Sequence, residues 1–398
     1  MLRAGAGLST DRDSARAAAE AAAGALRAAG IERADALLVF ATTAHGPAFG
    51  RVTRTAGEAA GTRTVVGCSA AGVLAGQEEI EEGPGVAVLA LAGDLHARRF
   101  MVPTSRHDPD GAASGIAAAV DGPASCGDRV LVLFADTYNV DLAGLLEALA
   151  TRLPGVRIVG GGASEDGSVG EVAVFSGDAS SSHAVSGVLL DGEFRATVGV
   201  SQALRRVGPV CRITAADGQW ILSLDGAQAL GVFRSVVPEP LLAEPRRALA
   251  VVLAGLVTDD GGFITRHLIG LDAAREAVAV ASPVRVGQEL FFGVRDPLAA
   301  RETLDGVLAQ QVAAWPGSGP RAAVYVNCVG RGRRFYGVPG LDTAYIAQRF
   351  ADVAVAGFFS GAEFAPGSRA TYVHQYTGVL TMLGPESHAG TRAPGRGT

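Results

Sequence analysis

The chain has 398 residues, of which 48% are hydrophobic and 19% charged, a composition that excludes a disordered protein and allows a large core. Its net charge is −6, so the composition gives no sign of a basic surface for nucleic acid. All 34 of its Lys-or-Arg residues are arginine, which excludes chemistry that depends on a lysine. The longest apolar run, 248–257, is about half a bilayer span, and the N-terminus lacks the apolar core of a signal peptide. We therefore expect a cytoplasmic protein without membrane insertion.

The first predicted helix covers residues 12–29, with Thr10 or Asp11 as its cap and Gly30 at its end. It is rich in alanine, with Leu26 as its one bulky apolar residue, so we expect it on the surface. Further along the chain, 85–91 predicts a strand, 111–120 a helix, and 142–153 a helix with leucines on one face.

One pattern occurs three times: an apolar strand, a helical stretch, and a second apolar strand that enters a Gly-rich corner. The two strands of each copy lie roughly 27–30 residues apart, the length of a strand–helix–strand unit. A small-residue corner after a strand leaves backbone N–H groups free to meet a ligand. The copies join 36–42 to 65–76, 130–137 to 157–167, and 322–332 to 353–366.

The pattern changes near Arg205, where residues 211–230 predict a hairpin with a turn at Asp217-Gly218 and a helix from Asp225. Strands at 248–257, 266–271, 278–284 and 289–293 and a helix over 297–314 are predicted before the third copy. We expect an α/β fold with mixed sheets, βαβ units and antiparallel meanders. The expected parts are one domain over 1–203, a second over 204–383, and a disordered tail over 384–398.

The corners and their flanks resemble the FIST family, a sensory domain of bacterial, archaeal and eukaryotic signalling proteins. The N-terminal half is similar to its first domain through VVGCSAAGVLAGQEEIEEGPGVAVLAL and RIVGGGASEDG. The C-terminal half is similar to the second through ITAADGQWILSLDG, NCVGRGRRF and GFFSGAEFAP, followed by His374 and Thr377. These blocks cover most of residues 30–382 in the family's order. One departure is Ala362, where the family often has a second glycine.

The resemblance implies binding of a small ligand, with an amino acid favoured, rather than catalysis. No kinase, methyl-accepting or cyclase-like block is present in the sequence. A signalling role would therefore use a separate output protein as partner.

The first corner contains Gly67, Cys68 and Ser69. As an anion site, its backbone N–H groups would hold a carboxylate or phosphate. As a nucleophile elbow, Cys68 or Ser69 would attack a substrate, although the pattern is not G-x-S-x-G. The third interpretation is that small residues let the strand and the corner pack tightly.

The second corner contains Gly160, Gly161 and Gly162. Each glycine costs roughly 0.5–1 kcal/mol relative to alanine, a cost accepted where the backbone needs a positive φ or a close approach. We expect a ligand-facing corner, with a tight turn as the alternative. Glu165 and Asp166 beside it are expected to be solvated turn residues.

The third copy supplies Cys328, Gly330 and Arg331 after one strand. Arg331 either binds a ligand carboxylate with its two-pronged guanidinium or belongs to a basic turn with Arg333 and Arg334.

The last corner adds an aromatic wall, a hydroxyl and a carboxylate: Phe359, Ser360, Gly361 and Glu363. Such a mixture suits a pocket for a small polar molecule. Glu363 would bind the ammonium of an amino acid whose carboxylate binds to Arg331. The alternative is that Glu363 caps a turn or forms a structural ion pair with an arginine. His374 either faces this pocket or is a hydrogen-bonded structural residue.

The four cysteines, Cys68, Cys126, Cys211 and Cys328, have neither C-x-x-C nor metal-ligand spacing. We expect reduced thiols and neither metal nor cofactor. Two alternatives to a sensor stay open. One is a Cys- or Ser-dependent hydrolase or transferase that uses Cys68 or Cys328 with a lowered thiol pKa. The other is an interaction scaffold for a separate output protein.

Overall fold

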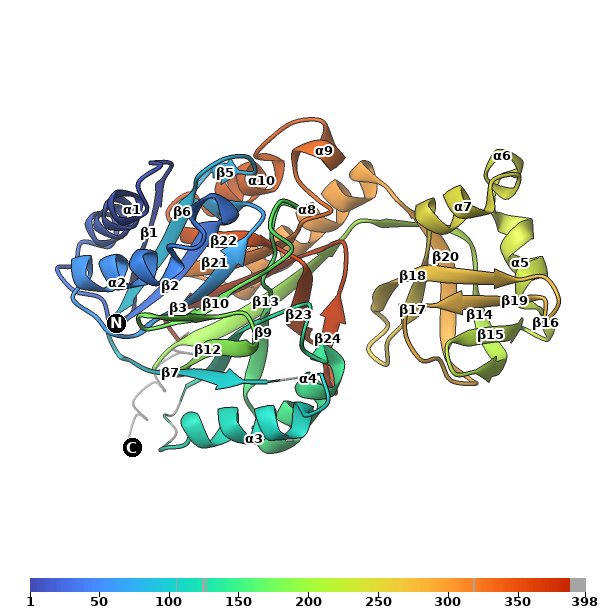
Figure 1. The fold of residues 1–398 in the computed structure, drawn as a ribbon, viewed down its shortest axis with the longest axis horizontal. Coiled ribbons are helices and arrows are strands. Elements are labelled where there is room, and N and C mark those ends of the chain that lie inside the picture. Colours follow the sequence, from blue (N-terminus) through green and yellow to red (C-terminus); the bar gives the residue numbers. More distant parts are fainter. Residues whose placement is uncertain (105, 124, 126, 318, 387–398) are drawn as a thin grey trace, which may run out of the picture.

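The computed structural model describes residues 1–104, 106–123, 125, 127–317 and 319–386 (Figure 1). Cys126 and positions 387–398 of the expected tail lie outside the described residues. Within the described ranges, three six-stranded sheets form the body, and a seven-stranded sheet forms a barrel that stands beside it. The predicted α/β class with mixed sheets is confirmed. In this part of the chain no helix is long and apolar enough to cross a membrane.

The three sheets of the body share one strand order: two antiparallel strands, a parallel pair, and a hairpin that pairs antiparallel to the second parallel strand. Sheet 1 contains β1 (Arg3–Ser9), β6 (Val86–Ala92), β2 (Ala36–Thr42), β3 (Val65–Ala70), β10 (Val174–Ser176) and β11 (Ala179–Ser181). Sheet 2 contains β7 (Leu95–Pro103), β12 (Ala184–Gly192), β8 (Arg129–Ala135), β9 (Arg157–Gly162), β23 (Ala362–Pro366) and β24 (Thr371–His374). Sheet 3 contains β13 (Arg195–Gln202), β25 (Thr377–Gly384), β21 (Ala322–Cys328), β22 (Ala354–Ser360), β4 (Val73–Ala75) and β5 (Glu78–Ile80).

The hairpins are exchanged between the sheets. The hairpin β4–β5 follows β3 of sheet 1 along the chain but pairs with β22 of sheet 3. In the same way, β10–β11 follows β9 and joins sheet 1, and β23–β24 follows β22 and joins sheet 2. Each predicted corner is therefore the segment in which the chain crosses from one sheet to the next.

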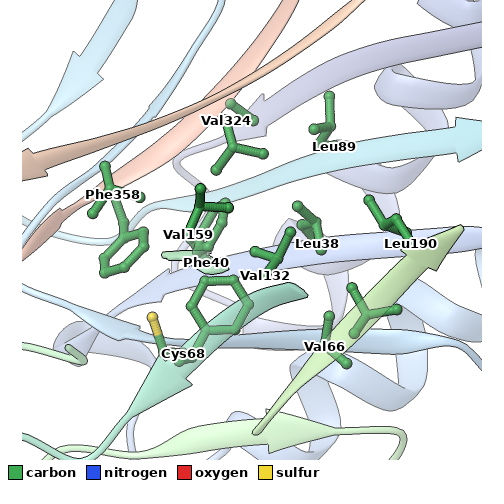
Figure 2. Close-up of a cluster of buried hydrophobic side chains, with 14 of the residues drawn as sticks. Leu38, Phe40, Val66, Cys68, Leu89, Val132, Val159, Leu190, Val324 and Phe358 are labelled. Carbon is green, nitrogen blue, oxygen red and sulfur yellow. The ribbon is translucent and has the colours of Figure 1, made fainter. Parts of the chain in front are cut away.

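The inner faces of the three sheets form one central core (Figure 2). Leu38, Val132 and Val324 come from the first parallel strand of each copy and all lie in this core. The rings of Phe40 and Phe358 stack with centroids 4.9 Å apart. Burial of this apolar surface is the main stabilising contribution to the body.

Helices cover the outer faces, two for each sheet in the described residues. Each pair forms a further apolar cluster with the sheet that it covers. The pairs are α1 (Ser14–Ala29) and α2 (Phe49–Ala59) on sheet 1, α3 (Pro109–Ala119) and α4 (Leu142–Arg152) on sheet 2, and α8 (Pro297–Ala314) and α10 (Leu341–Arg349) on sheet 3.

The first helix corrects two expectations. Its cap is Asp13, whose carboxylate accepts hydrogen bonds from Ala15 N and Arg16 N, and not Thr10 or Asp11. Its alanines are buried instead of lying on the surface, because small side chains let the helix backbone approach β1 closely. The buried alanines are Ala17, Ala18, Ala21, Ala22 and Ala25.

The barrel is inserted between β13 and α8. Its order, β14-β20-β17-β18-β19-β15-β16, is closed by pairing of β14 with β15. The predicted domain boundary at 203 falls where the chain leaves sheet 3 for the barrel, and the division into domains 1–203 and 204–383 stays a prediction. The barrel elements are β14 (Leu204–Asp217), β15 (Trp220–Leu224), β16 (Ala227–Gln228), α5 (Ala229–Val236), α6 (Glu239–Leu242), α7 (Pro245–Val251), β17 (Val252–Val257), β18 (Phe263–Asp272), β19 (Ala277–Val280) and β20 (Glu289–Arg295).

Two barrel boundaries were predicted wrongly. The helix after β15 begins at Ala229 instead of Asp225, because Asp225 and Gly226 have positive φ and form a turn. The first four residues of the apolar run 248–257 belong to α7, and the other six form β17. A short apolar run does not distinguish a strand from a buried helix by periodicity alone.

Equivalent positions in the second parallel strand of every copy are glycine. A side chain there would point at the preceding strand, and for Gly160 a methyl group would overlap the carbonyl oxygen of Leu133. The close approach of the two strands therefore depends on a missing side chain. The equivalent residues are Gly67, Gly160 and Gly357.

We predict that Gly160→Ala lowers the free energy of unfolding by about 2–3 kcal/mol, because the new methyl group forces the parallel pair apart. Urea denaturation of the wild type and the variant measures this difference in the free energy of unfolding. The control, Gly306→Ala in α8, has open space around the new methyl group and is expected to stabilise the protein by about 0.5–1 kcal/mol. Equal effects of the two substitutions would contradict the packing role.

Candidate functional site

The three corners meet at Ser164, a buried residue that follows β9. Its hydroxyl accepts a hydrogen bond from Ala71 N (2.9 Å) of the first copy and donates one to Phe359 O of the third. Its carbonyl oxygen accepts a hydrogen bond from Ser69 Oγ (3.2 Å). Ser164 thus joins all three copies. Ser164 is absent from the residues predicted from the sequence, although a hydroxyl that directly follows the Gly160–Ala163 run of small residues is a usable signal.

A cavity of about 420 Å³ opens beside this junction, and we call it the corner cavity. Each copy contributes residues that follow its parallel strands, and the hairpin β4–β5 forms a further wall. This is the place where ligands bind in many α/β sheets, beyond the carboxyl ends of the parallel strands. The lining residues are Ala71, Gly72, Glu79, Ile80, Glu81, Glu82, Glu165, Asp166, Val329, Arg333, Arg334, Pro339 and Phe359.

The lining carries charges of both signs on an apolar base. Ile80, Val329 and Phe359 supply apolar surface. Arg333 and Arg334 supply exposed guanidinium groups. The lining carboxylates outnumber them. A molecule with an ammonium and a carboxylate group would find partners for both groups here.

Glu79 connects the exchanged hairpin to α10. Its carboxylate accepts hydrogen bonds from the backbone N–H groups of Gly340 and Thr343, both at 3.2 Å, at the N-terminus of that helix. Burial and the nearby charge of Asp342 raise the pKa of Glu79 to about 7, and the bonds from Thr343 only partly oppose them. Glu79 therefore changes its charge near neutral pH.

Two other carboxylates hold the neighbouring loops. Glu81 accepts hydrogen bonds from Arg333 N at 2.8 and 3.0 Å, and burial nevertheless raises the pKa of Glu81. For Glu165, burial opposes ionisation, but hydrogen bonds from the N–H groups of Val169 and Gly167 outweigh it and lower its pKa. Glu165 and Asp166, expected as solvated turn residues, both line the cavity.

Of the predicted ligand contacts, Phe359 lines the corner cavity. Gly67 and Gly160 face the neighbouring parallel strand instead, which favours the packing interpretation. Gly161 and Gly162 are buried opposite Glu363 and Ala362 of β23. The second and third corners are thus brought together, but their backbones fill the space between them.

Ser69, Ser360 and Gly361 also serve the junction itself. Ser69 Oγ accepts a hydrogen bond from Ala173 N (2.9 Å), in addition to the bond that it donates to Ser164. Ser360 Oγ donates to Gly162 O (2.9 Å), and Gly361 N donates to the same carbonyl at 3.1 Å. These hydrogen bonds stabilise the crossing of the chain.

Arg331 is a structural residue in this fold. Its side chain is fully buried, and its Nη2 lies 3.1 Å from Asp342 Oδ2. Its guanidinium also donates hydrogen bonds to Ser201 O (3.0 Å) and Tyr336 Oη (2.7 Å). Arg331 is thus held by protein groups and does not line the corner cavity, which favours a structural role over contact with a ligand carboxylate. Arg331 is buried because its loop packs against β13, a contact that the local sequence does not reveal.

Glu363 and His374 are buried as well. Glu363 Oε2 accepts a hydrogen bond from Thr377 N (3.2 Å), and burial raises the pKa of this carboxyl well above its ordinary value. Burial thus disfavours the charged form with which Glu363 would bind an ammonium. Burial and the charge of Arg266 lower the pKa of His374 to about 4, so its imidazole is neutral at pH 7. Neither side chain lines the corner cavity.

Burial disfavours the thiolate form of both cysteines named for the enzyme alternative. Cys68 lies in the central core (Figure 2), and burial raises its pKa well above the ordinary value. Cys328 Sγ accepts hydrogen bonds from the N–H groups of Gly330 (3.4 Å) and Tyr376 (3.3 Å). Burial nevertheless raises the pKa of Cys328. A nucleophilic thiolate needs the opposite shift.

The raised pKa of Glu79 predicts a pH effect on stability. Between its ordinary value of 4.5 and about 7, the folded protein holds this proton more tightly than the unfolded chain does. Its contribution to stability is therefore lost as pH rises through that window. Between pH 4.5 and pH 8, the free energy of unfolding of Glu79→Gln should therefore rise relative to that of wild type by on the order of 1–3 kcal/mol. Urea denaturation across this range tests it, and parallel curves for the two proteins would contradict it.

Two family models match this chain. The FIST N domain matches residues 35–227, and the FIST C domain matches residues 229–366. The uncharacterized protein Rv0628c of Mycobacterium tuberculosis is 31% identical over 393 residues, which cover 96% of this chain and 100% of that protein. The uncharacterized protein Mb0898c of Mycobacterium bovis is 30% identical over 394 residues, which cover 96% and 99%.

Proposed function

Because this chain belongs to the FIST family, whose domains are regarded as sensory domains of signal transduction, we propose that it senses an amino acid that binds in the corner cavity. The observation that carries this proposal is that loops of all three copies line one cavity with charges of both signs. A ligand in this cavity would contact all three copies at once.

The lining residues suggest one orientation for the ligand. Arg333 and Arg334 would hold its carboxylate, since a guanidinium binds a carboxylate through two parallel hydrogen bonds. Glu165 and Asp166, on the loop after β9, would hold its ammonium. Phe359 would contact an apolar side chain. This set replaces the pair of Arg331 and Glu363 that the sequence suggested.

Binding would also change how the loops are held together. Arg333 N already donates hydrogen bonds to Glu81, which directly follows the hairpin β4–β5, and Glu79 of that hairpin contacts the start of α10. A ligand on Arg333 would therefore affect the exchanged hairpin and α10 together. A separate output protein that recognises this change stays a prediction.

Isothermal titration calorimetry against the twenty amino acids tests the proposal. We expect at least one to bind, and the double variant Arg333→Ala/Arg334→Ala to bind it about tenfold or more weakly, because charge-assisted hydrogen bonds are lost. The matched control is Arg246→Ala/Arg247→Ala, which removes two adjacent exposed arginines from α7 and should leave the affinity unchanged.

Two results would overturn this assignment. One is that none of the twenty amino acids binds to the folded wild-type protein. The other is that an amino acid binds equally well to wild type and to the Arg333→Ala/Arg334→Ala variant, which would place its site elsewhere.

A further inference from the structure

A second cavity of about 720 Å³ lies between the barrel and the body, and we call it the barrel cleft. Strands β17 and β18 and the loop before β20 form most of it. Tyr372 of β24 contributes from the body. It shares no lining residue with the corner cavity.

Arg266 of β18 is the distinctive group in the barrel cleft. Its Nη1 donates hydrogen bonds to two neutral acceptors, Thr265 O (2.8 Å) and Val373 O (3.0 Å). Among the described residues, no carboxylate lies within ion-pair distance of Arg266, and its Nε and Nη2 have no protein acceptor. Burial without a compensating charge lowers the pKa of Arg266 to about 10. The guanidinium thus keeps two donors on one edge, the arrangement that matches a carboxylate.

Ser282 follows β19, the strand that pairs with β18, and it lines the barrel cleft together with Arg266. Ala281 N donates a hydrogen bond to His267 O (2.9 Å), which places Ser282 across the ladder from Arg266. Its Oγ is buried and has no partner within the described part of the chain. A carboxylate on Arg266 would give this hydroxyl an acceptor.

The remaining charges of the cleft favour an anion. Its two acids are already occupied, since Glu289 lies 3.2 Å from Arg212 and Asp259 lies 3.8 Å from Arg369. Arg285 also lines the cleft and forms no ion pair within the described residues. The apolar part of the lining includes Leu256, Val257, Ile264, Pro283 and Val286.

We propose that the barrel cleft is a second binding site, which takes a small organic carboxylate. The carboxylate binds to Nε and Nη2 of Arg266 and to the hydroxyl of Ser282, and the apolar part of the ligand lies against Ile264 and Tyr372. Because Arg266 also holds Val373 of β24, an occupant strengthens the contact between barrel and body. This site is independent of the proposed amino acid site.

Fluorine NMR of 4-fluorobenzoate with the full-length protein tests the proposal. We expect saturable binding of 4-fluorobenzoate and none of 4-fluorobenzamide, its neutral analogue. Arg266→Gln should weaken binding about tenfold or more, and Ser282→Ala, which keeps the contact to Val373, about threefold. The control Arg206→Gln, an exposed arginine on β14, should bind as wild type does.

Competition with inorganic phosphate distinguishes a site for carboxylates from a site for phosphate. If phosphate displaces 4-fluorobenzoate at equal concentration, the assignment to a carboxylate is overturned. Absence of 4-fluorobenzoate binding, or equal binding to wild type, Arg266→Gln and Ser282→Ala, overturns the site itself. The variant Arg333→Ala/Arg334→Ala should bind 4-fluorobenzoate normally, so that failure at one cavity is distinguishable from failure at the other.

Discussion

Each sheet of the body is completed by a hairpin from a different copy of the repeat, and these exchanges tie the three sheets together. The crossing requires a parallel strand pair that packs closely just before the chain leaves the sheet. Glycine at equivalent positions in each copy, as at Gly160 opposite Leu133, permits that close approach. The central core then forms where the three inner faces meet, with the rings of Phe40, Phe134 and Phe358 in mutual contact. No single copy can bury this surface alone.

The exchange also determines where a ligand can bind. The corners themselves are filled by backbone and by short hydrogen-bonding side chains such as Ser164 and Ser360. The corner cavity lies beside them, and its charged walls come from segments that continue past each corner. Glu79 and Glu81 reach the third copy only because their hairpin belongs to sheet 3. A ligand that binds there would contact the segments that hold the three sheets together, which suits a sensory role.

Much of the fold could be predicted from the sequence, because apolar periodicity and turn residues act locally. The repeated strands and the helix α8, predicted over 297–314, are examples. The burial of individual side chains could not be predicted in this way. Arg331 and Glu363 stand beside glycines as ligand contacts would, but pairing with distant segments buries both. The carboxylates of the hairpin β4–β5 carry no local signal, since the cavity that they line is formed with residues about 250 positions away.

Hydrogen–deuterium exchange would show whether the three copies form one ligand site. Amide exchange would be measured by mass spectrometry with and without a saturating amino acid that binds. We expect slower exchange in segments of all three copies, 71–82, 164–170 and 329–343, and unchanged exchange in the barrel. Protection confined to one copy, or located mainly in the barrel, would contradict this expectation.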